Sequence, residues 1–220
     1  MTDNKLIEVA FVLDRSGSMA GKEEDIIGGF NSMIEKYRNE DTEALVTTIL
    51  FDDRITTLHD RIPMSEVKKM TDEEYYVGGC TALLDAVGYT VEHISEIHKY
   101  IERMPVKTFV VVMTDGYENA SKKFTKEKLS RLVKLKEEND RWEFVFVGAD
   151  IDAFAESHNV GISDRRAVRF SKTDDNLGDV FEATGEMMFK IAPQFYDLRV
   201  SDEAVEEVYR KVRDARKKNN

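Results

Sequence analysis

The stretch Phe109–Gly116 reads FVVVMTDG and begins with an uninterrupted apolar run. Its first part, Phe109–Met113, is rich in valine, a β-branched residue that favours an extended backbone. A strand without polar alternation is typical of a sheet that is covered on both faces. Phe109–Met113 is therefore predicted to be a central strand of a mostly parallel sheet.

On either side of that strand, short apolar runs alternate with segments of helical periodicity. Further strands are expected at Leu6–Leu13, Ala44–Phe51, Ile55–Leu58, Trp142–Val147 and Ala167–Phe170. Helices are expected at Lys22–Arg38, Ala82–Ile101, Phe124–Asn139, Ile151–His158 and Asp174–Ile191, with a short helix from Ser65. The acidic break Asp52-Asp53-Arg54 predicts a hairpin, so the strand after it should run antiparallel at a sheet edge. This order predicts an α/β protein with a doubly wound, mostly parallel six-stranded sheet, one antiparallel edge strand and helices on both faces.

Pro193 and the turn after it separate a final segment from this α/β pattern. Residues 1–194 are predicted to form one domain and residues 195–220 a helical tail with a basic end. Ser201 is expected to cap a last helix that ends near Lys217. The basic end is interpreted as a solvated helix terminus, with contact to an acidic surface as the alternative.

The composition excludes several classes of protein. Among 220 residues, 32 Lys and Arg stand against 43 Asp and Glu, a net charge of −11 that opposes binding to nucleic acid or an anionic membrane. The run Leu6–Leu13 contains Glu8 and has no basic region before it, so it is a poor signal peptide. No stretch approaches the ~18 apolar residues of a membrane span. The one cysteine, Cys80, cannot form an internal disulfide and is expected to be a small packing residue in a cytoplasmic protein.

Oxygen-bearing side chains follow two of the predicted parallel strands. Asp14-Arg15-Ser16-Gly17-Ser18 comes directly after the first strand, and Asp115 comes directly after the central one. Ligands of doubly wound sheets bind outside the carboxyl ends of the strands, where these two segments should meet. The turn Gly78-Gly79-Cys80-Thr81, just before a long helix, can bring a third hydroxyl to the same edge.

Asp14, Ser16, Ser18, Thr81 and Asp115 are therefore the predicted metal ligands. Two carboxylates and three hydroxyls, without histidine or thiol, suit Mg²⁺, with Mn²⁺ or Ca²⁺ as alternatives, and do not suit zinc. Neutral hydroxyls also leave room for an oxygen from outside the chain. A helix-capping turn would explain the first three residues but not Thr81 and Asp115. Arg15 is expected to point away from the ion, either towards a partner or into solvent at the rim.

Asp14-x-Ser16-x-Ser18, the threonine of the Gly-Gly-x-Thr turn and Thr114-Asp115-Gly116 resemble the von Willebrand factor type A (VWA) domain over about residues 5–192. The matching positions are that family's metal-ion-dependent adhesion site (MIDAS). The segment Thr114–Ser121 resembles the small free-standing bacterial or phage members. The resemblance implies that Ser16 and Ser18 bind the metal directly and that a partner protein's carboxylate completes its coordination. Thr81, Asp14 and Asp115 would bind directly or through water.

The leading functional hypothesis is a metal-dependent protein-binding module without catalytic activity. One alternative is a Mg²⁺-dependent phosphohydrolase, because an Asp at the end of the first strand also resembles haloacid-dehalogenase-type sites. Those sites use a second Asp two residues later as the general acid, whereas this chain has Ser16, and no histidine or lysine lies in the motif loops. The other alternative is a structural subunit of a bacterial or phage stress or ATPase-linked complex. The partner and the oligomeric state are left open.

Overall fold

The computed structural model describes residues 6–39, 42–139, 141–149, 153–163, 166–170, 177–191, 201, 203, 207 and 210. Its strands form one six-stranded sheet in the order β3-β2-β1-β4-β5-β6, and only the β2–β3 pair is antiparallel. The strands are β1 (Leu6–Asp14), β2 (Glu43–Phe51), β3 (Ile55–Pro63), β4 (Lys107–Thr114), β5 (Trp142–Ala149) and β6 (Ala167–Phe170). The predicted fold class is confirmed, including the antiparallel edge strand.

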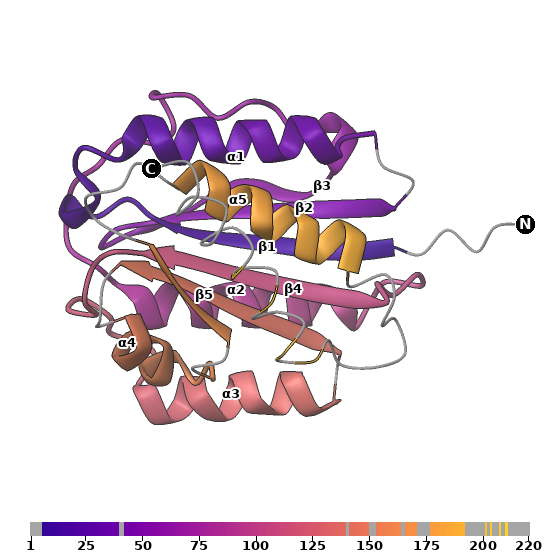
Figure 1. The fold of residues 1–220 in the computed structure, drawn as a ribbon. Coiled ribbons are helices and arrows are strands. Elements are labelled where there is room, and N and C mark those ends of the chain that lie inside the picture. Colours follow the sequence, from indigo (N-terminus) through magenta and orange to yellow (C-terminus); the bar gives the residue numbers. More distant parts are fainter. Residues whose placement is uncertain are drawn as a thin grey trace, which may run out of the picture.

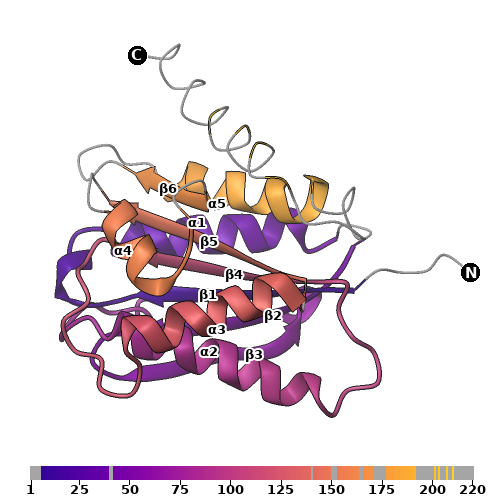
Figure 2. The same cartoon turned by 90° about the horizontal axis from the view of Figure 1, so that it is seen from below.

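Helices cover both faces of this sheet (Figures 1 and 2). The α-helices are α1 (Glu23–Tyr37), α2 (Leu83–His98), α3 (Lys126–Asn139), α4 (Ala153–Val160) and α5 (Leu177–Glu186), and a π-helical turn spans Met187–Ile191. Short 3₁₀ turns occur at Gly17–Met19 and Met64–Glu66. Helices α1 and α5 share one core with alternate β1 residues such as Phe11 and Leu13, whereas Ala10 and Val12 face the core of α2 and α3. The two-residue period of the strand thus divides the interior into two layers.

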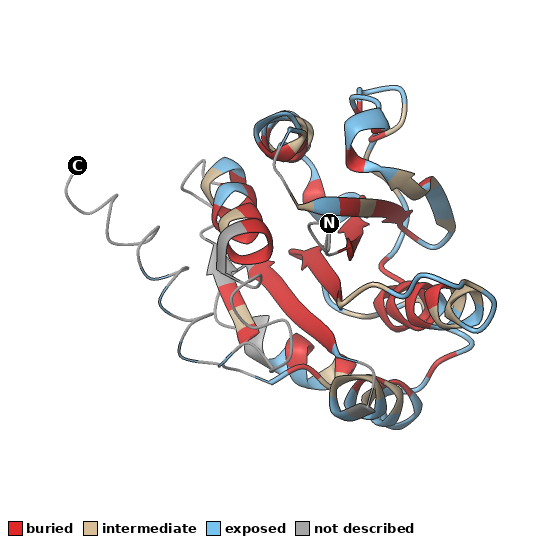
Figure 3. Cartoon of the chain, turned by 90° about the vertical axis from the view of Figure 1, so that its right-hand side faces the viewer, coloured by how far each residue is buried: buried red, intermediate tan, exposed pale blue. Residues whose placement is uncertain are grey.

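The two central strands are completely buried, as Figure 3 shows in red. Every residue of β1 and of β4 is buried. Strand β4 has side chains packed in both cores, which is the physical reason for the unbroken apolar run FVVVM. Because both strands lack solvent-facing positions, their carboxyl ends are held rigidly where the loops begin.

Helices α1 and α5 approach closely through glycine. A Cβ at Gly29 would lie 2.5 Å from Phe181 Cδ2 and 3.2 Å from Gly178 Cα. No side chain fits in that space, so Gly29 allows the two helices to pack against each other over the same half of the sheet. Among the described residues, none of the helices is both long and apolar enough to cross a membrane.

The structure differs from the sequence-based expectation at several element ends. Strand β3 continues to Pro63 instead of ending at Leu58, because an edge strand tolerates the polar residues that interrupt the pattern there. Arg61 adopts a positive φ of 51° beside a register shift against β2. The expected start of the last helix of the domain, residues 174–176, lies outside the described residues. Most of the predicted tail also lies outside them, so the division at residue 194 stays a prediction.

Buried charges near the amino ends of the strands are paired. Glu8 accepts from Arg61 Nε at 2.7 Å and lies 2.7 Å from His98 Nε2. Glu143 accepts from Lys107 Nζ at 3.0 Å and also pairs with Arg166. A buried carboxylate is strongly unfavourable unless such partners compensate it. At this end of the sheet the buried carboxylates are therefore compensated by basic side chains of the chain itself.

Candidate metal centre

Asp14 and Thr114 end the neighbouring parallel strands β1 and β4. The Thr114 hydroxyl donates to Asp14 Oδ2 at 2.5 Å, and the Ser16 backbone N–H donates to Asp14 Oδ1 at 2.7 Å. Both carboxylate oxygens of Asp14 are therefore fixed by short hydrogen bonds. The side chain of Asp14 has one orientation at the carboxyl edge of the sheet.

Three hydroxyl groups gather beside it. Ser16 Oγ lies 3.0 Å from Ser18 Oγ and accepts from Thr81 Oγ1 at 2.9 Å. Thr81 is positioned from the other side by Asn119, whose Oδ1 accepts from Thr81 N at 2.9 Å and whose N–H donates to Thr81 O at 3.0 Å. The hydroxyl contributed by the Gly-Gly-x-Thr turn thus reaches the two serines of the first loop, as the sequence predicted.

Gly116 shows how closely these oxygens converge. A Cβ built on this residue would lie 2.7 Å from Ser18 Oγ, 2.9 Å from Thr81 Oγ1 and 3.4 Å from Asp14 Oδ2. Three candidate ligand atoms from two separate loops therefore surround one point next to Gly116. Any side chain there would displace them, and glycine keeps the space available.

Asp115 completes the set with a second buried carboxylate. Its side chain is 1% exposed, and its Oδ2 forms an ion pair with Lys22 Nζ. Its Oδ1 is buried and has no hydrogen-bond partner among the described residues. An unpaired buried carboxylate oxygen is costly and normally indicates a ligand, an ion or water.

The electrostatics of Asp14 also favour a cation. The pKa of Asp14 is raised from 3.8 to about 6, mainly by burial; the hydrogen bonds from Thr114 and Ser16 oppose this shift, and the charge of Asp115 adds to it. The Tyr75 hydroxyl donates to the backbone carbonyl of Asp14, and burial raises the pKa of the Tyr75 phenol. Burial and the neighbouring charge of Asp115 disfavour ionisation of Asp14, and a divalent ion would relieve that cost.

The residues fit a small divalent ion bound by hard oxygens. Across the described ranges, no group of three or more His, Cys, Asp and Glu side chains is arranged to hold a metal. Most of the candidate ligands at this edge are instead hydroxyls, the donor type that suits Mg²⁺ better than zinc. Three observations favour a small divalent ion here: the donor set, the convergence of oxygens beside Gly116 and the unpaired Asp115 oxygen.

Two expectations about neighbouring residues are wrong. Arg15 is buried: its guanidinium pairs with Asp52 at 3.2 Å, donates to Thr56 Oγ1 at 3.1 Å and lies 4.6 Å from the Tyr76 ring centroid. It therefore links loops within the chain and is neither a partner contact nor a solvated rim charge. Cys80 is exposed instead of packed, although the next residue, Thr81, is buried.

Sequence reasoning missed the residues that hold the candidate ligands. Lys22 was expected only at the start of a helix, and Thr114 was named in the Thr114-Asp115-Gly116 motif without an expected contact to Asp14. No lysine was expected beside the motif loops, but Lys22, four residues after Ser18, contacts Asp115. The pair Gly21-Lys22 could have indicated this contact, because a turn at Gly21 returns the chain to the sheet edge.

The loop after Asp115 is fastened to the start of α2. Glu118 accepts from Ala120 N, Ser121 N and Leu84 N at 2.8 to 2.9 Å. Asp85, in the first turn of α2, accepts from the backbone N–H groups of residues 122–124. This network fixes Thr81 and Asp115 relative to each other.

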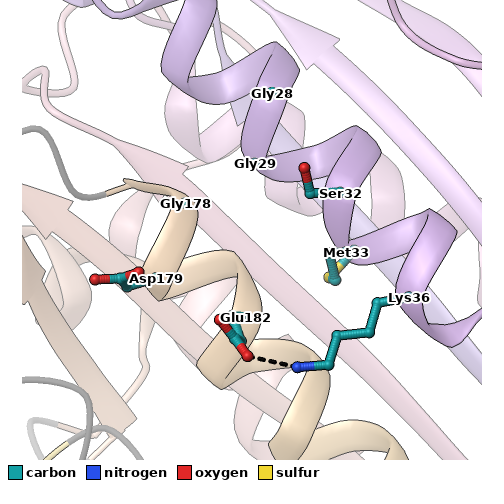
Figure 4. Close-up of a pocket in the computed structure, with 8 residues that line it drawn as sticks. All are labelled: Gly28, Gly29, Ser32, Met33, Lys36, Gly178, Asp179 and Glu182. Carbon is teal, nitrogen blue, oxygen red and sulfur yellow. Dashed lines mark hydrogen bonds and ion pairs between the residues drawn. The ribbon is translucent and has the colours of Figure 1, made fainter. Parts of the chain in front are cut away.

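A pocket lies between α1 and α5, away from the candidate metal centre, with a volume of about 280 Å³ (Figure 4). Lys36 of α1 reaches across it to Glu182 of α5. The rest of the lining consists mainly of small or apolar residues, namely Gly28, Gly29, Ser32, Met33 and Gly178, together with Asp179. This pocket lies where glycines let the two helices approach each other. Its lining does not bring together a set of oxygen atoms like that of the candidate metal centre.

The fold and this edge define a class of protein: a doubly wound α/β domain that presents carboxylate and hydroxyl oxygens at the ends of its central strands. Comparison with family models matches residues 8–183 to the von Willebrand factor type A domain. The chain belongs to this family. Domains of this family are generally metal-dependent protein-interaction modules.

Solved structures share the fold at low sequence identity. Proximal thread matrix protein 1 from the mussel byssus is 19% identical, with a TM-score of 0.60 over 84% of this chain and 46% of its own. A von Willebrand factor type A protein from Catenulispora acidiphila is 12% identical, with a TM-score of 0.57 over 83% of this chain and 42% of its own. The chain thus spans a little under half the length of these proteins.

The vWF domain of the type V pili tip protein Mfa5 from Porphyromonas gingivalis matches over most of its own length. It is 11% identical, with a TM-score of 0.61, and the match covers 84% of this chain and 95% of that domain. The mussel protein has also been solved with a zinc-occupied MIDAS motif, at 16% identity and a TM-score of 0.59 over 84% of this chain and 46% of its own. No curated protein matches the chain.

Proposed function

We propose that this chain is a metal-dependent protein-binding module of the small free-standing bacterial or phage type. Asp14, Ser16, Ser18, Thr81 and Asp115 would hold one divalent ion, and a carboxylate of a partner protein would complete its coordination. The observation that carries the proposal is the buried, unpaired Oδ1 of Asp115 beside convergent hydroxyls. The zinc-occupied MIDAS of the mussel protein supports occupation by a divalent cation.

The proposed ion is Mg²⁺, with Mn²⁺ and Ca²⁺ as alternatives. Two carboxylates balance a divalent charge, and three neutral hydroxyls leave the ion undersaturated, with a position open for an outside oxygen. An ion in this state attracts a further anionic oxygen. The chemistry that the metal supplies is therefore capture of an external carboxylate.

Exposed aromatic side chains near the candidate centre support a protein as the partner. Tyr76 is 56% exposed over the Arg15 guanidinium, and Tyr117 is 54% exposed next to Gly116. Tyrosine is enriched among the residues that dominate binding energy at protein interfaces. One metal–carboxylate contact gives modest affinity, and these loops would supply the rest.

A purely structural role for the ion is less well supported, because the loops are already joined without it. Gly17 N donates to Gly79 O at 3.2 Å, Gly78 N donates to Arg15 O at 2.9 Å, and Ala82 N donates to Asp52 O at 2.9 Å. These backbone bonds connect the segments that the ion would otherwise have to stiffen.

Catalysis is also less well supported. The position two residues after Asp14, where haloacid-dehalogenase-type sites have a general acid, is held by Ser16, whose hydroxyl accepts from Thr81. Lys22 lies in the site but is paired with Asp115. Hydrolysis of p-nitrophenyl phosphate with Mg²⁺, lost in Asp14→Asn, would establish the enzyme instead.

The test is affinity capture from the source organism's lysate on immobilised protein, with Mg²⁺ or with EDTA. The expected result is a defined set of proteins retained only with Mg²⁺ and lost on Asp14→Ala. Asp72→Ala, on the exposed loop before Tyr75, is the matched control and should retain them. Full retention by Asp14→Ala would contradict the proposal.

A further inference from the structure

Lys22 brings a fixed positive charge into the candidate metal centre. Its Nζ forms an ion pair with Asp115 Oδ2, and its side chain is only 14% exposed. By contrast, Lys36, which pairs with Glu182 on the helix surface, is 44% exposed. A partly buried lysine beside a fully buried candidate ligand is unlike an ordinary surface ion pair.

The backbone specifies this placement. Lys22 N donates to Met19 O at 3.1 Å, and Lys22 O accepts from Ile26 N at 3.0 Å, so the residue is locked between the serine loop and α1. Gly21 precedes it with φ of +87°, a conformation that other residues rarely adopt, and its N–H donates to Glu23 Oε2 at 2.7 Å. The turn at Gly21 directs Lys22 back over the carboxyl edge of the sheet.

We propose that Lys22 is a built-in counter-cation that competes with the divalent ion for Asp115 and thereby sets the metal affinity of the centre. This inference rests on the proposed metal site but not on capture of a partner. The ammonium and the ion are both attracted to the same carboxylate and repel each other at close range. Metal binding must therefore weaken the Lys22–Asp115 pair or leave two cations in contact.

The same competition links metal retention to an external anion. Once the ion binds Asp115, the Lys22 ammonium shares that carboxylate with the ion and lies close to it. A carboxylate that approaches the ion also approaches this ammonium, and it lowers the energy of both cations. Because binding couplings are reciprocal, an anionic ligand then tightens metal binding and the metal tightens anion binding.

The test measures Mn²⁺ binding to the full chain by electron paramagnetic resonance of free Mn²⁺ and by calorimetry. Lys22→Met removes the charge and should tighten Mn²⁺ binding at least about tenfold relative to the native chain. Lys22→Arg retains the charge and should bind as the native chain does. Lys36→Met, which removes the charge of an exposed ion pair between α1 and α5, is the matched control and should change nothing.

A second measurement, thermal unfolding, needs no bound metal. In EDTA, Lys22→Met should unfold at a lower temperature than the native chain, because the buried Asp115 carboxylate loses the charge that it is paired with. If Lys22→Met does not fold in EDTA, Lys22→Gln, which is neutral and can still donate to Asp115, replaces it in both measurements.

Equal or weaker Mn²⁺ binding by the neutral Lys22 variants, with binding intact in the native chain, would overturn this inference alone. Absence of Mn²⁺ binding in the native chain and in every Lys22 variant would overturn the metal site together with the inference. Binding that is detected only in Lys22→Met or Lys22→Gln would support both.

Discussion

The Thr114 hydroxyl donates a 2.5 Å hydrogen bond to Asp14 Oδ2 and so joins the carboxyl ends of β4 and β1 at the candidate metal centre. The two residues meet because Leu13 and Met113 are partners in the parallel register of these strands. A candidate ligand that is oriented by a buried hydroxyl depends on that hydroxyl for its geometry.

Thr114→Val should therefore weaken Mg²⁺ binding without removing a proposed ligand. The variant preserves shape but leaves Asp14 Oδ2 without its donor, and loss of such an outer partner typically costs roughly 10- to 100-fold in metal affinity. Calorimetric titration with Mg²⁺ measures the change. Thr114→Ser keeps the hydroxyl and should restore most of the affinity; equal affinity for the valine variant would show that the bond does not orient Asp14.

Gly116→Ala should disrupt the convergence of the hydroxyls. The new methyl group would lie 2.7 Å from Ser18 Oγ and 2.9 Å from Thr81 Oγ1, so these oxygens must move. We expect metal affinity to fall by about tenfold or more, with a loss of stability of about 1–3 kcal/mol from overpacking. Gly78→Ala is the matched control, because a Cβ there meets nothing within 4 Å. Native-like metal binding by Gly116→Ala would contradict the proposed position of the ion.

Asp85→Ala should destabilise the fold itself. The carboxylate accepts from the backbone N–H groups of Lys122, Lys123 and Phe124 at 2.8 to 2.9 Å, and all three lose their acceptor. The expected loss of unfolding free energy is about 3 kcal/mol, measured by urea denaturation. The exposed Asp72→Ala should stay within about 0.5 kcal/mol of the native chain. If Asp85→Ala lowered the free energy of unfolding as little as Asp72→Ala, Asp85 would not be the residue that holds the segment 122–124.

Metal binding should weaken in acid through Asp14. Its pKa is raised to about 6, so protons compete with the ion below that pH, and Mg²⁺ affinity should fall by about tenfold for each pH unit. The native state binds this proton more tightly than the unfolded chain does. The metal-free protein should therefore lose up to about 3 kcal/mol of stability as pH rises from about 4 to about 6.

Thermal unfolding at several pH values checks the sign of this effect. The stabilisation gained on adding Mg²⁺ should increase from pH 5 to pH 7.5, because the ion relieves the cost of ionised Asp14. Asp14→Asn removes the titrating group and should lose both the metal response and this part of the pH dependence. A Mg²⁺ gain that is larger at pH 5 would refute the assignment.

The fold and the positions of the candidate ligands could be predicted because they follow from local chemistry. The middle of a strand that is covered on both faces is mostly apolar, which made Phe109–Met113 recognisable as a central strand. A parallel sheet brings the carboxyl ends of its strands to one edge, which placed Asp115 near Asp14. The end of β3 could not be placed at Pro63, since exposed polar residues at a sheet edge read like a loop. A cytoplasmic location also stays a prediction.

The surroundings of the centre could not be predicted because they depend on contacts between distant segments. Arg15 is buried against residues of other segments, among them Asp52, Thr56 and Tyr76. Lys22 is 93 positions from Asp115, and no local pattern links a lysine at a helix start to a particular carboxylate. Sequence shows which atoms can bind a metal, whereas the packed loops decide what those atoms touch.

Anomalous difference density from a crystal grown with Mn²⁺ would locate the proposed metal site directly. We expect a peak at the carboxyl ends of β1 and β4, about 2.1 Å from the hydroxyl oxygens of Ser16 and Ser18. Asp14 and Asp115 should lie within direct or water-mediated reach of it. No peak at this edge in saturating Mn²⁺, or a peak only at exposed acidic residues elsewhere, would contradict the account.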